Sequence, residues 1–125
     1  MPKKILCAAL TVAIVYFAAV LIFVNAASAE DVWIDSYSSR VQCYVMTDTF
    51  VNRTQYRDNR AFSVDVKFVG ATVAVHNYSF RENDGLIYFS VDGGADNFID
   101  SDKLAARIWE FGLDFLGINY EVRYD

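Results

Sequence analysis

The chain has 125 residues, of which 16 are acidic, 11 are basic and one is histidine, so its formal net charge is −5. This length corresponds to a single small domain, and the acidic charge disfavours nucleic acid and anionic membranes as general partners, because both attract basic surfaces. The single histidine excludes a histidine-rich zinc site.

The amino end has the pattern of a secretory signal. Two lysines follow Pro2, residues 5–24 are uncharged and mostly apolar, and Ala27 and Ala29 place small residues at the two positions that a signal peptidase reads. We therefore predict a signal peptide over residues 1–29 and a mature chain that begins at Glu30. The alternative is a retained membrane anchor, since about 20 apolar residues are enough to span a bilayer.

Removal of the signal changes the net charge and the cysteine content of the remaining residues 30–125. The net charge becomes about −7, because the two lysines leave with the signal. Cys7 leaves as well, so Cys43 has no partner for an internal disulfide, and stability must come from packing. We interpret Cys43 as a small apolar residue in a strand, with an intermolecular bridge or a reactive thiol as the alternatives.

Period-two alternation predicts the first three strands of a sheet. Residues 32–35 and 41–50 form a hairpin across a polar turn. The clearest alternation runs from Phe62 to Phe68, where apolar residues alternate with polar ones, so one face of the sheet is buried and the other is wet. A longer loop, residues 51–60, precedes this third strand.

Two further strands are predicted over residues 72–81 and 86–91. The Asp84-Gly85 step between them is typical of a tight hairpin turn. Within residues 72–81 the apolar phase shifts near His76 and Asn77, which predicts a β-bulge at that point.

After these strands the apolar period becomes that of an amphipathic helix. The residues that recur at three- and four-residue steps are Leu104, Ile108, Phe111 and Phe115. With Ser101 as the expected N-cap and Gly117 as the C-cap glycine, the helix is predicted over about residues 101–116. Alternation at Tyr120, Val122 and Tyr124 then indicates a short terminal strand.

This order of elements predicts the fold class. Strands followed by a helix favour an α+β fold, an antiparallel β-meander of about five strands with one C-terminal amphipathic helix packed on one face. Residues 30–125 are expected to form this single domain.

The mature chain carries few residues that suggest catalysis or a cofactor. It has no glycine-rich phosphate loop and no Cys-x-x-Cys pair, and we interpret His76 as structural. The aspartates between residues 92 and 102 do not have EF-hand spacing, so we interpret them as caps and solvated turn residues rather than calcium ligands. We predict no catalytic residues, no metal site and no cofactor, while carboxylates such as Asp48 and Asp65 leave a small hydrolase as the alternative.

The loop of residues 51–60 concentrates arginine and tyrosine in an otherwise acidic domain. These residue types commonly dominate protein contacts and anion recognition, so the loop is a candidate binding site. The candidate binding residues are Arg53, Tyr56, Arg57 and Arg60. The alternative is a solvated loop whose arginines balance nearby acids such as Asp58.

The second predicted strand is apolar on both of its faces. Its two sets are Val41, Cys43 and Val45 on one face and Tyr44 and Met46 on the other. Part of the sheet face away from the helix is therefore expected to be covered by a partner, by a ligand or by a second copy in a homodimer.

Three segments resemble small exported bacterial domains of the surface-adhesin E-like type. They are Trp33 near the mature start, the strand Tyr44–Thr49 that ends in Asp48 and Thr49, and the strand Phe62–Lys67. The resemblance covers about half of the domain. It implies a surface or periplasmic interaction module and provides no catalytic residues.

The sequence therefore predicts an exported protein, located in the periplasm, on the cell surface or outside the cell. Its function is expected to be that of a non-catalytic binding or interaction domain, with membrane contact only through the signal segment. The expected partner is another exported protein or a cell-envelope component. The alternatives are an inhibitor of another exported protein and a small carboxylate-dependent hydrolase.

Overall fold

The computed structural model describes residues 31–123. The predicted signal peptide, with its cleavage residues Ala27, Ala29 and Glu30, lies outside the described residues, as does Tyr124 of the predicted terminal strand. Among the residues that are described, no helix is long and apolar enough to cross a membrane.

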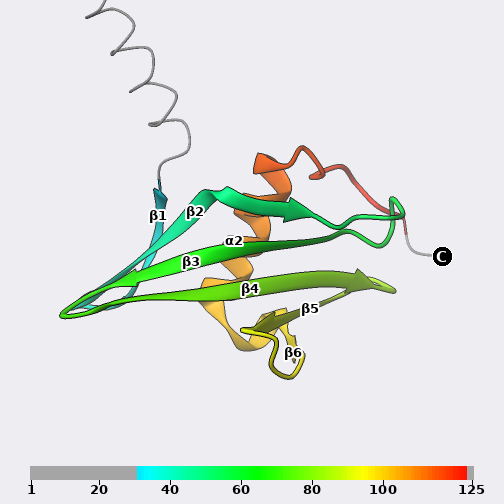
Figure 1. Ribbon diagram of the computed structural model, residues 1–125. Helices are drawn as coiled ribbons and strands as arrows, with labels where there is room; N and C mark the ends of the chain where they lie inside the picture. Colours follow the sequence, from blue (N-terminus) through cyan, green and yellow to red (C-terminus); the bar gives the residue numbers. More distant parts are fainter. Residues whose placement is uncertain (1–30, 124–125) are drawn as a thin grey trace, which may run out of the picture. The chain divides into compact units, whose positions relative to one another are not determined.

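Residues 31–123 form a six-stranded antiparallel sheet with one α-helix laid across one face (Figure 1). The strands, each paired with the next along the chain, are β1 (Asp31–Ser38), β2 (Val41–Asn52), β3 (Ala61–Val69), β4 (Val73–Asn83), β5 (Leu86–Val91) and β6 (Asn97–Phe98). The helix is α2 (Lys103–Phe115), preceded by a 3₁₀ turn, η1 (Ile99–Ser101). The predicted α+β meander with a C-terminal helix is confirmed.

Two details of the predicted element order were wrong. The two-residue strand β6 was not predicted, because a segment this short shows no measurable alternation. Residues 118–123 are not in a strand, although Tyr120 and Val122 alternate with polar residues.

The ends of α2 are fixed by its flanking residues. The N-cap is Asp102 rather than the predicted Ser101, because the Asp102 carboxylate accepts a hydrogen bond from the Ala105 amide at 3.1 Å. At the other end Gly117 has a φ of 69°, and the amide of Ile118 donates to the Leu113 carbonyl at 2.9 Å. This is the Schellman arrangement that the predicted C-cap glycine favours.

The bulge predicted near His76 and Asn77 is absent from β4, whose register with β3 is unbroken from Ala61↔Arg81 to Val69↔Val73. The apolar phase shifts for another reason. The first residues of β4 lie at the end of the sheet away from α2 (Figure 1), and there Val73 and Val75 are exposed on the opposite face. Farther along, Tyr78 and Phe80 are buried against the helix.

The pairing of β1 with β2 shifts register twice, and the register of β2 with β3 shifts between Met46 and Val51. The Thr49 hydroxyl stabilises this bulge. It donates a hydrogen bond to the Met46 carbonyl at 2.6 Å and accepts one from the Asp65 amide at 2.8 Å. The bulge moves Phe50 onto the helix side of the sheet, where its ring stacks on Phe115 with centroids 4.6 Å apart.

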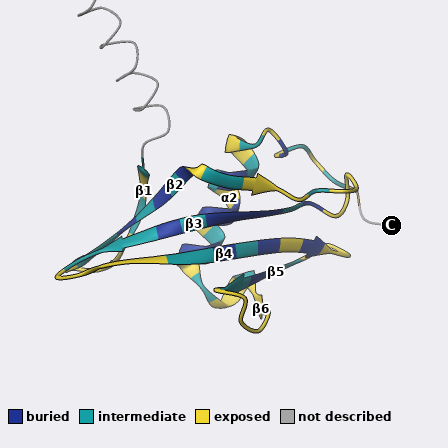
Figure 2. Ribbon diagram, in the orientation of Figure 1, coloured by how far each residue is buried: buried dark blue, intermediate teal, exposed yellow. Residues whose placement is uncertain are grey.

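The core lies between α2 and the central strands, with buried positions along β3 and the adjoining parts of β2 and β4 (Figure 2). Phe62 is at its centre, and its ring is stacked on Trp109 with centroids 5.5 Å apart. Gly112 lets the helix approach this ring closely, because a Cβ atom at that position would lie 2.2 Å from Cζ of Phe62. Aromatic packing of this kind holds together a domain that has no disulfide.

Candidate functional site

The candidate binding site is the connection between β2 and β3, residues 53–60, called the arginine loop below. It continues the hairpin as an ordered structure. The Arg53 amide donates to the Ala61 carbonyl at 2.8 Å, and the Asn59 amide donates to the Tyr56 carbonyl at 3.0 Å. The Thr54 hydroxyl also accepts a hydrogen bond from the Ala61 amide at 3.0 Å. The loop therefore holds its exposed side chains on a fixed backbone.

Arg60 lies inside the fold. Its Nε and Nη2 atoms donate to the Glu82 carboxylate at 2.9 and 2.7 Å, and the two side chains are only 10% and 2% exposed. Its Nη1 donates to the carbonyls of Ile118 and Tyr120 at 2.9 and 3.1 Å. Arg60 therefore braces the arginine loop against the C-terminal segment, and the exposed candidate residues are Arg53, Tyr56 and Arg57.

A signal for this buried pair was present in the sequence. Glu82 continues the period-two series of Tyr78 and Phe80, which places it on the buried face of β4. A buried carboxylate requires a cation, and the chain reverses so that Arg60 lies beside it. The ion pair of Arg60 and Glu82 could therefore have been predicted from the position of Glu82 in the alternation of β4.

Arg57 is held by an aromatic ring. Its guanidinium carbon lies 3.9 Å from the centroid of the Tyr120 ring, a cation–π contact, and the guanidinium of Arg60 lies 5.4 Å from the same centroid. Tyr120 was predicted as part of a terminal strand, and no local pattern places it against the loop.

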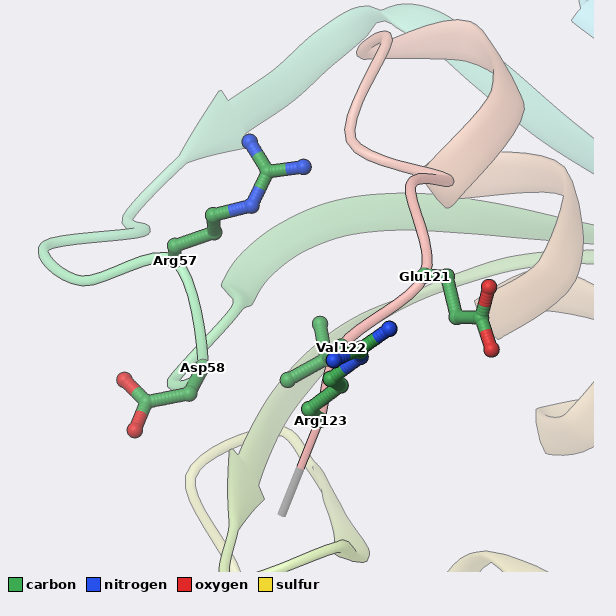
Figure 3. Close-up of a pocket in the computed structure, with 5 residues that line it drawn as sticks. All are labelled: Arg57, Asp58, Glu121, Val122 and Arg123. Atoms are coloured by element: carbon green, nitrogen blue, oxygen red, sulfur yellow. The ribbon is translucent and has the colours of Figure 1, made fainter. Parts of the chain in front are cut away.

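One cavity, of about 370 Å³, opens between the arginine loop and the C-terminal segment (Figure 3). Its lining residues are Arg57, Asp58, Glu121, Val122 and Arg123. The carboxylates of Asp58 and Glu121 lie on opposite sides of the cavity, and both point away from the guanidinium of Arg57 (Figure 3). The two carboxylates also point away from each other (Figure 3), whereas a catalytic pair flanks one substrate bond that lies between its two carboxyl groups.

A second cavity, of about 270 Å³, is lined by the other candidate residues, Arg53 and Tyr56. Arg53 uses Nε to donate to the Ser63 hydroxyl at 3.3 Å, and Tyr56 is 65% exposed. Arg81 of β4 also lines this cavity and is paired with Asp96 at 2.8 Å. The structure thus brings Arg53 and Tyr56 to one cavity and Arg57 to the other.

The aspartates between residues 92 and 102 have separate partners. Asp96 pairs with Arg81, Asp102 caps α2, and Asp92 accepts hydrogen bonds from the Asn77 amide at 2.7 Å and from His76 Nδ1 at 2.6 Å. The His76 side chain, followed by the Asn77 amide, lowers the pKa of Asp92. Within residues 31–123, no group of three or more His, Cys, Asp or Glu side chains could hold a metal ion.

Cys43 is completely buried in β2, facing the helix. Burial raises the pKa of its thiol, which disfavours the reactive thiolate. This position fits the interpretation of Cys43 as an apolar packing residue.

The sheet face opposite α2 carries an exposed apolar patch. Trp33, Tyr44, Lys67 and Val75 are register neighbours across β1 to β4. Val73, which is 62% exposed, lies two residues from Val75 on the same face of β4. The only charge within this row, Lys67, forms an ion pair with Asp31. The row itself therefore carries no unpaired charge, and the nearest other charge of β3 on this face is Asp65.

In comparisons with known proteins, the chain matches no family model, no curated protein and no solved structure. The resemblance to surface-adhesin E-like domains therefore stays a prediction.

Proposed function

We propose that this protein is an exported, non-catalytic binding or interaction domain that contacts its partner through Arg53, Tyr56 and Arg57 of the arginine loop. The expected partner is another exported protein or a cell-envelope component, and inhibition of an exported protein is one form that such binding can take. The observation that carries the proposal is the internal brace from Arg60 to Glu82 and to the C-terminal carbonyls.

This brace supports a binding function because it fixes the loop before any partner arrives. A loop held in one conformation loses little conformational entropy on binding, so more of the contact energy appears as affinity. Tyrosine and arginine are also the residue types that most often dominate binding energy at protein interfaces. The exposed side chain of Tyr56, placed between Arg53 and Arg57 in the sequence, fits that description.

The proposal is tested by capture of partners from the native cell envelope. The tagged full chain is expressed in its natural host, and the captured proteins are compared with those of a variant that carries Arg53→Ala, Tyr56→Ala and Arg57→Ala. Arg60 is left unchanged, since its loss would disturb folding. The matched control changes Arg40 and Arg107, two exposed arginines outside the loop.

We expect the loop variant to lose a partner that both the wild type and the control retain. An identical set of captured proteins in all three samples would refute the binding role of the loop. Export is tested separately by mass spectrometry of the same material. A mature terminus at Glu30 is expected, and an intact terminus at Met1 or Pro2 on a cytosolic species would contradict export.

The exposed apolar patch on the sheet favours a second contact surface, with another copy of the chain as its occupant. Self-association of an acidic domain is opposed by charge repulsion, and this repulsion is reduced where Lys67 and Asp31 neutralise each other. Sedimentation analysis should detect a dimer that Val75→Asp dissociates. A monomer for the wild type at high protein concentration would rule out the homodimer.

The alternative of a carboxylate-dependent hydrolase requires two acids that face one substrate bond. The acids that line the larger cavity, Asp58 and Glu121, point away from each other (Figure 3). This orientation favours the binding proposal.

A further inference from the structure

We infer that the arginine loop recognises an acidic segment of a partner polypeptide, with a carboxylate bound in the cavity between Arg57 and Arg123. This inference rests on the proposed function and specifies the chemical class of the partner.

The first argument is the distribution of charge. Apart from Lys3 and Lys4, the chain has nine basic side chains. Five of them lie at or near the two cavities. Four line the cavities, namely Arg53, Arg57, Arg81 and Arg123, and Arg60 is the buried arginine that ends the arginine loop. More than half of these basic side chains therefore lie at one end of the domain, where the acids beside them are Asp58, Glu82, Asp96 and Glu121.

The second argument is that two of these guanidinium groups are available. Arg60 and Arg81 are paired with Glu82 and Asp96. Among the described residues, no hydrogen bond or ion pair engages Arg57 or Arg123, and both are exposed. Each guanidinium carries five N–H donors, so the larger cavity has unused donors on two of its walls.

The third argument is the position of Arg57. Its guanidinium carbon lies 3.9 Å from the centroid of the Tyr120 ring, a cation–π contact. Among the described residues this contact uses no N–H group of Arg57 in a hydrogen bond, so the N–H groups remain free to form the two parallel hydrogen bonds that a carboxylate accepts. The side chain is thereby pre-organised for a planar anion, which reduces the entropy lost on binding.

The fourth argument concerns the kind of anion. The volume of about 370 Å³ falls at the lower end of the range for ligand cavities. Val122 supplies an apolar wall that can contact the methylene groups of an acidic side chain. Asp58 and Glu121 at opposite sides would repel a dense polyanion, so the site suits single carboxylates separated by neutral residues.

The inference is tested with a fluorescein-labelled heptapeptide, Gly-Glu-Ala-Gly-Glu-Ala-Gly, and with its counterpart in which glutamine replaces glutamate. The protein is purified after export from cells that express the full chain. Fluorescence anisotropy measures the dissociation constant at low and at moderate salt. The net acidic charge of the protein predicts repulsion of the glutamate peptide, so binding would reveal the local site.

We expect the glutamate peptide to bind about tenfold or more tightly than the glutamine peptide, because charge-assisted hydrogen bonds are lost in the latter. Added salt should weaken the binding. The double variant Arg57→Ala, Arg123→Ala should lose this preference, whereas the control with Arg40→Ala and Arg107→Ala should keep it. Arg57→Lys should recover only part of the affinity, since lysine cannot form the parallel pair of hydrogen bonds.

Equal affinity for the two peptides, or full affinity in the double variant, would overturn the inference. Circular dichroism of the exposed-site variants verifies that they are folded. If the envelope capture still depends on the loop while the glutamate peptide does not bind, the partner class is wrong and the proposed function stands. If the capture does not depend on the loop, the proposed function itself fails.

Discussion

The packing of α2 on the sheet leads to a prediction in which the sign of a mutational effect reverses. Replacement of glycine by alanine inside a helix normally stabilises a protein by about 0.8–1.0 kcal/mol. At position 112 of this chain the opposite is expected. A Cβ atom there would lie 2.2, 2.6 and 2.8 Å from three ring carbons of Phe62, far inside the optimal carbon–carbon separation of about 3.5–4.0 Å.

The ring of Phe62 cannot move away easily. It is fully buried, and its centroid lies 4.9 Å from that of Phe80, 5.5 Å from that of Trp109 and 5.7 Å from that of Phe50. Overpacking of a core costs about 1–3 kcal/mol, and the short contacts place this case near the upper end. After subtraction of the gain in helix propensity, Gly112→Ala should lower the free energy of unfolding by about 1–2 kcal/mol.

The measurement is denaturant unfolding followed by tryptophan fluorescence. The informative control is the same substitution in a Phe62→Leu background, where the ring carbons that clash are gone. There Gly112→Ala should be neutral or should stabilise by up to about 1 kcal/mol relative to Phe62→Leu alone. Stabilisation by Gly112→Ala in the wild-type background would refute the reasoning, since it would mean that the core around Phe62 relaxes to accept the added methyl group at little cost.

Three further predictions concern charged and titratable groups. Arg60→Ala should cost about 3–5 kcal/mol in the free energy of unfolding, because it leaves the buried Glu82 carboxylate without its partner. Arg81→Ala, which breaks the half-exposed pair with Asp96, should cost at most about 1 kcal/mol. Equal losses in chemical denaturation would contradict the distinction between the two pairs. The pKa of Asp92 is lowered in the folded state, so its stabilising contribution is present above the unfolded pKa of about 3.9 and is lost as the pH falls through the folded value. Asp92→Asn should therefore flatten the acid part of a melting-temperature profile relative to the wild type, and an unchanged profile would contradict the prediction. Burial raises the pKa of Cys43, so a thiol reagent should modify it slowly in the native protein and rapidly in denaturant. Rapid modification of the native protein would instead favour a reactive thiol.

The parts of the fold that could be predicted from the sequence are those set by local periodicity. The alternation from Phe62 to Phe68 and the glycine at 117 each specify a local geometry, and both are present as expected. The bulge predicted in β4 was wrong because a sequence pattern does not show how far along a strand the helix reaches. β4 keeps its alternation, so Val73 and Val75 lie on the face opposite to Tyr78 and Phe80, and they are exposed there.

The candidate site was less predictable because it combines segments far apart in the chain. Composition identified the arginine loop, but it could not separate the buried Arg60 from the exposed Arg57. Tyr120 and Arg123 enter the site only through tertiary contacts, which no local pattern encodes. The phase of Glu82 on β4 is the one local signal that pointed to the buried pair.

The contacts of Arg60 with the carbonyls of Ile118 and Tyr120 also bear on the order of folding. They join residues 58 and 60 positions apart, whereas each hairpin of the meander joins near neighbours. Contacts of such separation carry a larger loop-closure cost and form late. A chain that has formed only its hairpins does not yet have the Tyr120 ring beside Arg57, so the binding site proposed above is complete only in the fully folded protein.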